Sequence, residues 1–166
     1  MSKLQKYGQN LLNDNEIIKN NRKIGIINNY TTFNDDIIKN LNLINLYNYN
    51  YKIIEKENYE GFFMKWHVDD AQIIKHNKNN NFTDQIKITD KQYLHYNKLK
   101  PSYSLIIYES DFGNDFVGGS FEFSDGTIIY PKKGMYVFFD SREVHRVNKI
   151  HKGVRKNYLI KFYKNL

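Results

Sequence analysis

From about residue 50 onward, the sequence is a series of short apolar runs separated by residues that favour turns. Runs of this length that are rich in β-branched and aromatic residues predict strands. Turn chemistry is supplied by SDG at 124–126 and PKKG at 131–134. Many short strands at this spacing favour a sandwich, jelly roll or barrel with helices packed on one side. We expect the strands at 51–56, 62–68, 102–109, 119–124, 134–140, 143–150 and 155–163.

The first 49 residues have a different pattern, with apolar residues at three- and four-residue spacings. This spacing predicts helices, and the two clearest segments are 10–24 and 31–46. Thr32 and Asn34 are both candidates for the N-cap of the second helix. Helices before a mainly β core place the chain in the α+β class.

A polar, asparagine-rich insertion runs from about 71 to 100 and is predicted to be a long loop with some local structure. The whole chain of 166 residues is long enough for one domain with a proper core and too short for two comfortable ones. We therefore expect a single domain over 1–166, with helical support at 1–49 and the β core at 50–163.

The absence of cysteine excludes a disulfide scaffold, a zinc site built on thiolates and a cysteine nucleophile. No apolar run approaches the length that spans a membrane, and the N-terminal residues lack the apolar core of a secretion signal. A cytoplasmic location with no membrane partner is the expectation.

The net charge of +7 invites a nucleic-acid function, but only four of the 25 basic residues are arginine. The lysines are scattered along the chain, which argues against a surface that tracks phosphates. Because arginine is scarce here, each arginine is a candidate for a role that needs its planar fork of donors.

His67 and Asp69 lie two residues apart in a predicted strand, FFMKWHVD, so their side chains share one face of it. That placement suits two neighbouring ligands of a metal ion. Alone the pair is weak evidence for a metal, and the polar end of an aromatic strand is the simpler explanation. A metal site needs a third ligand that is distant in sequence and close in the fold.

His145 is the candidate for that third ligand, because it opens a predicted strand after the apolar run MYVFFD and a short turn. His76 and His95 lie in the polar insertion and are interpreted as solvated. Two histidines and one carboxylate form the facial triad of non-haem iron, and they also suit zinc. The identity of the ligands does not choose between these metals.

Arg155 follows His145 by ten residues and begins the last predicted strand. A buried arginine near the metal could clamp a dianionic cosubstrate through paired, charge-assisted hydrogen bonds. The alternative is a surface arginine that balances nearby acidic groups.

Taken in order, His67-x-Asp69, YESDFGNDFVGGSFEFSDG, PKKGMYVFFD and HRVNKIHKGVR resemble the Fe(II)/2-oxoglutarate-dependent dioxygenases, in particular the prolyl 4-hydroxylase-like branch. The resemblance covers roughly 50–163 and implies a double-stranded β-helix, or jelly-roll, fold with supporting N-terminal helices. It implies the cofactors Fe(II) and 2-oxoglutarate, with ascorbate as reductant. The implied reaction converts 2-oxoglutarate to succinate and CO2 and hydroxylates a C–H bond, with a peptide or protein as the expected substrate.

The resemblance also assigns roles to residues. His67, Asp69 and His145 would bind Fe(II), Arg155 would pair with the distal carboxylate of 2-oxoglutarate, and Tyr108 would hydrogen-bond the same carboxylate. Gly118 and Gly119 match the Gly-Gly before a strand. The tyrosine that the family often carries nine or ten residues before the first histidine is absent. Asn58 and Glu57 stand there, beside Tyr59.

Two other functions stay open. RKNYLIK at 155–161 echoes the Arg-x-Asn and second basic residue of AlkB-type nucleic-acid demethylases, which share the fold. From a different class, a non-catalytic β-sandwich binding module would leave His67 and His145 as ordinary polar residues.

Overall fold

The computed structural model describes residues 16–19, 22–69, 74–76, 83–85 and 101–165. The described elements are fourteen strands and one helix, α2 (Asp35–Leu41). The first strands are β1 (Glu16–Lys19), β2 (Arg22–Ile26), β3 (Tyr49–Asn58), β4 (Met64–His67), β5 (Ile74–His76), β6 (Thr83–Gln85) and β7 (Tyr103–Tyr108). The others are β8 (Phe116–Gly118), β9 (Phe121–Phe123), β10 (Ile128–Ile129), β11 (Met135–Asp140), β12 (His145–Val147), β13 (Ile150–Gly153) and β14 (Arg155–Lys164).

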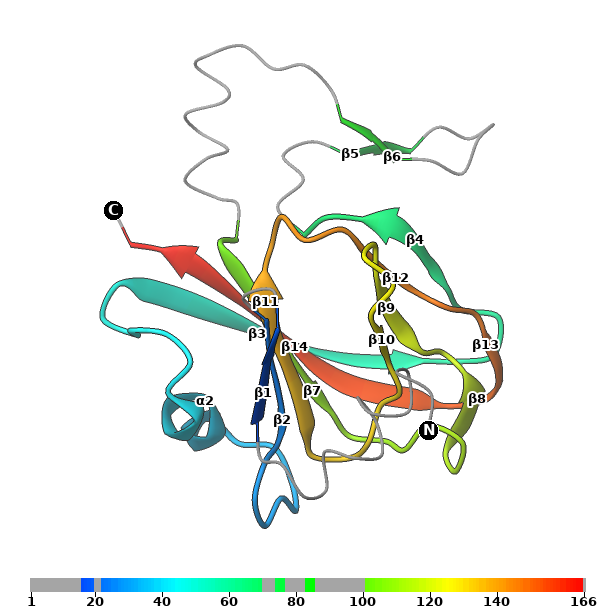
Figure 1. Ribbon diagram of the computed structural model, residues 1–166, viewed down its shortest axis with the longest axis horizontal. Coiled ribbons are helices and arrows are strands. Elements are labelled where there is room, and N and C mark those ends of the chain that lie inside the picture. Colours follow the sequence, from blue (N-terminus) through cyan, green and yellow to red (C-terminus); the bar gives the residue numbers. More distant parts are fainter. Residues whose placement is uncertain (1–15, 20–21, 70–73, 77–82, 86–100, 166) are drawn as a thin grey trace.

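Two antiparallel sheets form the body of the molecule (Figure 1). The large sheet has the order β1-β2-β11-β7-β14-β3, and the small sheet has the order β10-β9-β12-β4. Two further pairs, β13-β8 and β5-β6, lie outside these sheets. Apart from the hairpins β1-β2 and β10-β9, neighbouring strands are not consecutive in the chain, as expected when strands cross between two facing layers. The predicted jelly-roll fold is confirmed.

The main hydrophobic core fills the space between the two sheets. Both sheets supply aliphatic and aromatic side chains to it, and the buried members are Ile24, Ile106, Tyr108, Phe121, Phe123, Ile129, Met135, Val137, Phe139, Val147 and Leu159. Alternate residues of a strand point to opposite faces. Leu105 and Ile107 of β7 therefore belong to a second core on the outer face of the large sheet.

Helix α2 covers that outer face, on the side away from the small sheet (Figure 1). Its Ile38 is 3% exposed and packs among the outer side chains of the large sheet. Asn34 is the N-cap and accepts a hydrogen bond from the Asp36 backbone N–H, while Asn42 ends the helix in the left-handed conformation. The helix predicted at 31–46 is confirmed over 35–41, the middle of that range, with Asn34 and not Thr32 as the cap.

The helix predicted at 10–24 is wrong over the residues that the structure describes. Residues 16–19 and 22–26 form β1 and β2, an antiparallel pair that extends the large sheet. β2 also pairs with β11, which places Ile24 opposite Val137 in the main core. Pairing with an existing sheet edge outweighs the weak helical preference of this segment. Among the described residues before β3, the support is thus one helix and two strands.

The seven strands predicted beyond residue 50 are present, with their ends shifted by a few residues. The short strands β8 and β10 were not predicted, and the segment 143–150 divides into β12 and the start of β13. The insertion at 71–100 contains the strands β5 and β6, which are the local structure predicted for it. Most of its other residues, including His95, lie outside the described residues.

Gly118 and Gly119 form a bend, with φ of 78° and 70°. A Cβ added at Gly118 would approach the Lys149 carbonyl oxygen to 2.2 Å, so only glycine fits this close crossing of β8 and the chain before β13.

Within the described part of the chain, no helix combines the length and the apolar character needed to cross a membrane.

Candidate active site

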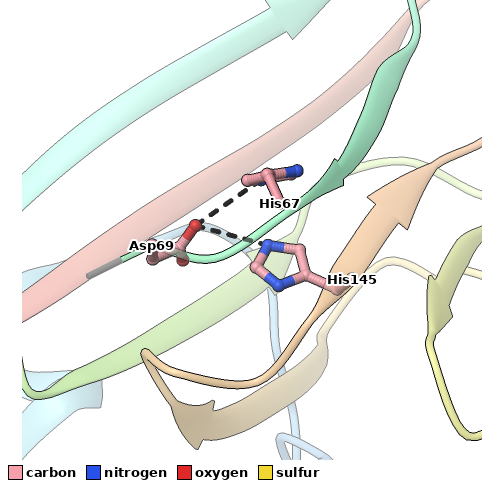
Figure 2. Close-up of side chains that lie close together, drawn as sticks. All are labelled: His67, Asp69 and His145. Atoms are coloured by element: carbon pink, nitrogen blue, oxygen red, sulfur yellow. Dashed lines mark ion pairs between the residues drawn. The ribbon is translucent and has the colours of Figure 1, made fainter. Parts of the chain in front are cut away.

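Three side chains that the sequence placed in one hypothetical metal site meet at one end of the small sheet (Figure 2). His67 ends β4, and His145 begins β12 directly opposite it in the antiparallel register. Directly opposed residues of neighbouring strands project from the same face, and the two ring centroids are 4.2 Å apart. Asp69, two residues beyond the end of β4, turns its carboxylate toward both rings.

Backbone carbonyls fix the tautomer of both histidines. The His67 Nδ1 lies 2.6 Å from the Lys65 carbonyl oxygen, and the His145 Nδ1 lies 2.8 Å from the Glu143 carbonyl oxygen. A carbonyl can only accept a hydrogen bond, so each Nδ1 carries its proton. The neutral ring then has its lone pair on Nε2, the arrangement that metal-binding histidines adopt.

Both Nε2 atoms face the same carboxylate oxygen. Oδ1 of Asp69 is 3.6 Å from Nε2 of His67 and 3.3 Å from Nε2 of His145. Three electron-pair donors at this distance repel one another unless a proton or a metal ion lies between them. The donor atoms lie within 4.8 Å of one another, and no other such group of three histidine or acidic side chains occurs among the described residues.

Asp69 is held from the large sheet as well. The Ser104 hydroxyl donates a hydrogen bond of 2.6 Å to Oδ2, and the Asp69 N–H donates to the Ser141 carbonyl. Burial opposes the ionisation of Asp69, but His145, the Ser104 hydroxyl and Lys161 outweigh it and lower its pKa to about 2. The carboxylate is thus charged at neutral pH and has one oxygen available for a metal ion.

Burial and the nearby His145 lower the pKa of His67, which favours the neutral ring that a metal ion requires. Two neutral imidazoles and one ionised carboxylate suit a divalent first-row metal ion, and they leave coordination positions open for other ligands. This chain therefore carries a donor set that fits the iron of the facial triad.

A cavity of about 200 Å³ lies between the two sheets beside this cluster. Most of its wall surface is apolar, and its polar lining comes from the three clustered residues and from β3 and β14. The lining residues are Lys56, Asn58, Phe62, Met64, His67, Val68, Asp69, Ile106, Phe121, His145, Val147, Arg155, Asn157, Leu159 and Lys161.

Arg155 lies in this cavity and is only 3% exposed. Its Nη1 donates to Asn157 Oδ1 at 3.1 Å, and its buried Nε has no hydrogen-bond partner among the described residues. No carboxylate in the described part of the chain forms an ion pair with it. A buried cation without a counter-charge is costly, so this arginine fits a site for an anionic ligand.

Tyr108 is next to Arg155, whose Cζ lies 5.3 Å from the centre of the tyrosine ring. The ring is fully buried and does not line the cavity. Its hydroxyl is another buried polar atom that lacks a partner among the described residues, and burial raises its pKa. The hydroxyl thus stays protonated and able to donate.

The structure also locates the residues at and near the positions, nine and ten residues before His67, where the family often carries a tyrosine. Asn58 is opposite Arg155 in the register and lines the cavity, with Oδ1 buried and unpaired among the described residues. Tyr59 is 56% exposed and takes no part in the cavity. Lys156 points to the other face of β14, where its Nζ lies 3.6 Å from a Glu57 carboxylate oxygen.

Sequence reasoning missed Lys56 as a cavity residue and treated Lys161 only as part of the AlkB-like echo. Lys161 could have been found from the alternation of side chains along β14. This alternation places on one face of the strand Arg155, Asn157, Leu159 and Lys161. Lys56 could not be placed in this way, because its facing depends on pairing with Asn157 from the far end of the chain.

Arg22 supports the turn before His145 and was also missed. Its guanidinium is 3% exposed, pairs with Glu143 at 2.7 Å and with Asp125 at 2.9 Å, and covers the Phe123 ring at 3.7 Å. Glu143 is the residue whose carbonyl fixes the His145 tautomer. Arg22 therefore anchors the turn that orients one donor of the candidate metal site.

The sequence profile of the 2OG-Fe(II) oxygenase superfamily matches residues 54–164. This range contains all three clustered residues as well as Tyr108, Arg155 and the two cavity lysines. No curated protein matches the sequence significantly.

Solved structures that resemble this chain include three oxygenases. The viral collagen prolyl hydroxylase of Paramecium Bursaria Chlorella virus-1 is 18% identical, with a TM-score of 0.49, over 71% of this chain and 62% of that protein. A 2OG-Fe(II) oxygenase family oxidoreductase from Burkholderia pseudomallei is 13% identical, with a TM-score of 0.48, over 70% and 44%. A Pseudomonas putida prolyl-4-hydroxylase is 16% identical, with a TM-score of 0.45, over 70% and 54%.

This chain thus spans about half of the length of these three proteins. All three TM-scores are under 0.5, so the assignment of the fold rests on the strand order and register given above.

Proposed function

Since the chain belongs to the 2OG-Fe(II) oxygenase superfamily, we propose that it is an Fe(II)- and 2-oxoglutarate-dependent dioxygenase that hydroxylates a C–H bond of a peptidyl, prolyl-type substrate. Succinate and CO2 are the co-products, and ascorbate serves as reductant. The observation that carries the proposal is the convergence of two histidine Nε2 atoms on the Asp69 carboxylate. The Nδ1 proton of each ring is bound by a backbone carbonyl, so each Nε2 lone pair is available to a metal ion. The cluster lies beside a cavity that contains a buried arginine with no ion-pair partner among the described residues.

In this proposal His67, Asp69 and His145 hold the iron. Bound together, Fe(II) and 2-oxoglutarate would activate O2, which is the oxidant: one oxygen atom would enter the C–H bond and the other the succinate left when 2-oxoglutarate loses CO2. The chain contributes fixed donors: the Lys65 and Glu143 carbonyls orient the rings, and Ser104 orients the carboxylate. Because these supports are already in place, the site is organised before a ligand enters.

Arg155 is proposed to bind the distal carboxylate of 2-oxoglutarate. Nη1 of Arg155 donates to Asn157 Oδ1, whereas Nε of Arg155 has no hydrogen-bond partner among the described residues. Tyr108 is proposed to donate its unpaired hydroxyl to the same carboxylate. A shift of its ring edge toward the cavity is required, because the residue does not line the cavity. Apolar walls from Ile106, Phe121 and Leu159 exclude water from the bound cosubstrate.

The peptidyl substrate is supported by the order of the motifs and by the ten residues from His145 to Arg155, which suit the prolyl 4-hydroxylase-like branch. An AlkB-type demethylase is the second candidate. It is favoured by one observation, that Arg155, Asn157 and Lys161 all line the cavity. A cytoplasmic location stays a prediction from the sequence.

The test is to add Fe(II), 2-oxoglutarate and ascorbate to the purified chain and to measure succinate. We expect slow succinate formation without a substrate and faster formation with proline-containing peptides that gain one oxygen atom by mass spectrometry. A methylated oligonucleotide that loses its methyl group instead would select the AlkB-type function. No succinate under any of these conditions would rule out both.

A further inference from the structure

The outer face of the small sheet carries a row of three side chains from three neighbouring strands. Arg146 of β12 is opposite Glu122 of β9 in the register, and on its other side it lies against Trp66 of β4. The residues before and after Arg146 are buried and line the cavity, so Arg146 itself points away from the cavity. The row is therefore back to back with the two histidines of the candidate metal site.

An irregularity in β4 turns Trp66 to this outer face. Two residues of β4, Lys65 and Trp66, stand opposite Arg146 alone, because the register shifts between the two ladder pairs that flank it. An extra residue of this kind is a β-bulge, and bulges at the edges of sheets re-aim side chains. β4 is the edge strand of the small sheet (Figure 1).

Two large aromatic side chains are exposed on this face. Trp66, the single tryptophan of the chain, is 42% exposed, and Phe63, just before β4, is 51% exposed. Both line a groove of about 470 Å³, called here the outer groove, whose other lining residues are Met64, Lys65, Arg146, Val147, Asn148 and Lys149. Exposed rings that share one groove mark a binding surface, and tryptophan and arginine dominate the binding energy of many protein interfaces.

Arg146 is held in place within the outer groove. Its Nε and Nη2 both lie 2.7 Å from Glu122 Oε2, and its Cζ lies 4.3 Å from the centre of the Trp66 ring. The Asn148 amide donates to the Ser120 hydroxyl at 2.9 Å and to Glu122 Oε2 at 3.4 Å. The guanidinium and the indole thus form a preorganised platform, which loses little conformational entropy when a partner binds.

The charge of the outer groove favours an acidic partner. Three of its lining residues, Lys65, Arg146 and Lys149, are cations, and none of the described lining residues is acidic. Glu122 pairs with Arg146. Lys149 is exposed and forms no ion pair with a residue that the structure describes. A groove with this excess of positive charge attracts and orients negatively charged ligands.

We propose that the outer groove docks an acidic, proline-containing polypeptide segment in the polyproline II conformation. Prolines of such segments pack on the aromatic side chains of a groove, and their backbone is already extended before binding. Acidic residues between the prolines pair with Lys149 and the neighbouring cations. The proposal is independent of the proposed function, because the outer groove opens on the face of the small sheet opposite to the metal and cosubstrate site.

A peptide fits the outer groove better than a single-stranded nucleic acid. The affinity of nucleic acids depends on many phosphate contacts along a continuous basic track. The outer groove offers three cations, and Glu122 already neutralises the charge of Arg146. An oligonucleotide and a second copy of this chain are therefore tested as alternative occupants.

The test uses the emission of Trp66, which reports on the outer groove because the chain has no other tryptophan. The whole chain is titrated with a tryptophan-free peptide that alternates proline and glutamate. Matched peptides replace every glutamate by glutamine or lysine, or every proline by alanine. We expect the proline–glutamate peptide to shift the emission to shorter wavelength and to bind at least about 10-fold more tightly than each matched peptide.

Variants of exposed residues separate docking from folding. Phe63→Ala should weaken binding of the proline–glutamate peptide about 10-fold, and Lys149→Gln about threefold, because an exposed ion pair contributes less than an aromatic contact. The matched controls, Tyr47→Ala and Lys152→Gln, remove an exposed tyrosine and an exposed lysine outside the outer groove. Both controls should bind the peptide as the wild type does.

Four results of the titrations would overturn the proposal. They are an unchanged Trp66 emission with the proline–glutamate peptide, equally tight binding of any matched peptide, unchanged binding by Phe63→Ala, and tighter binding of a short oligothymidylate. Sedimentation velocity supplies a fifth. Self-association of the free chain that Phe63→Ala abolishes would assign the outer groove to a second copy and would also overturn the proposal.

Discussion

The small sheet supplies the two imidazoles of the site, whereas the large sheet supplies the cations that line the rest of the cavity. His67 and His145 come from β4 and β12, and Arg155, Lys56 and Lys161 come from β14 and β3. Asp69 joins the two, since it follows β4 but is held by Ser104 of β7. In the proposed function the sheets thus divide metal binding and anion binding between them, and the proposed reaction requires both.

The difference reflects how each sheet is built. β14 and β3 pair over ten residues. Alternate residues of β14 therefore form a long row on the face toward the cavity, and this row includes both Arg155 and Lys161. The small sheet has strands of two to four residues, and its β4–β12 register shifts after the His145–His67 pair. A short, irregular sheet offers few fixed positions. In this sheet the two imidazoles are fixed by backbone carbonyls.

Removing a small-sheet ligand should have the largest effect. In His145→Ala we expect Mn(II) affinity to fall at least about 100-fold, because one of three donors is lost and Asp69 is left with a single imidazole. Metal titration followed by electron paramagnetic resonance measures this. His151→Ala, an exposed histidine of β13, is the matched control. Retained stoichiometric metal in His145→Ala would contradict the triad.

Removing the large-sheet arginine should affect only the anion. In Arg155→Met we expect 2-oxoglutarate affinity to fall about 30- to 100-fold, on the scale of roughly 2–3 kcal/mol for charged hydrogen bonds. Isothermal titration calorimetry with Mn(II) present gives the affinity, and Mn(II) binding itself should change little. Lys156→Met, on the opposite face of β14, is the control. Equal losses in both variants would move the anion site elsewhere.

The contact between the two sheets can be broken without touching a ligand. In Ser104→Ala the hydrogen bond to Asp69 Oδ2 is lost, and we expect Mn(II) affinity to fall about 10-fold, the lower end for groups that orient metal ligands. Ser141→Ala is the comparison, because Ser141 holds Asp69 directly through its backbone carbonyl and its own hydroxyl reaches the carboxylate only through the Ser104 hydroxyl, at 3.3 Å. The same titration serves for both, and identical affinities in the two variants would show that the hydroxyl is unimportant.

The smallest effect is expected at Tyr108. Tyr108→Phe removes a hydroxyl that has no partner among the described residues, so the free energy of unfolding should stay the same or rise by up to about 1 kcal/mol. If the hydroxyl contacts the cosubstrate, 2-oxoglutarate affinity should fall about fivefold. Urea unfolding and calorimetry separate the two quantities. An unchanged affinity would remove Tyr108 from the site.

Much of the site follows from the sequence because its motifs are local. His67 and Asp69 are two residues apart, and His145 and Arg155 begin predicted strands, so alternation within a strand fixes their relative facing. The roles of Lys56 and Arg22 are not local. Lys56 faces the cavity only because β3 pairs with β14, and Arg22 reaches Glu143 across 121 residues.

The fold shows the same limit. The strands after residue 50 have alternating or apolar patterns that single out a sheet. By contrast, the segment before residue 26 contains adjacent isoleucines that fit a helical spacing as well as a strand. Pairing of β2 with β11 decides the outcome, and that partner lies more than 100 residues away.

The central claim is that metal and anion meet in one cavity between the sheets. It is tested most directly by an anaerobic absorption titration with Fe(II) and 2-oxoglutarate, in which a 2-oxo acid bound to Fe(II) gives a visible charge-transfer band. We predict a band that requires both additions, is absent in His145→Ala and appears in Arg155→Met only at much higher 2-oxoglutarate. No band in the wild type at saturating concentrations of both would contradict the account.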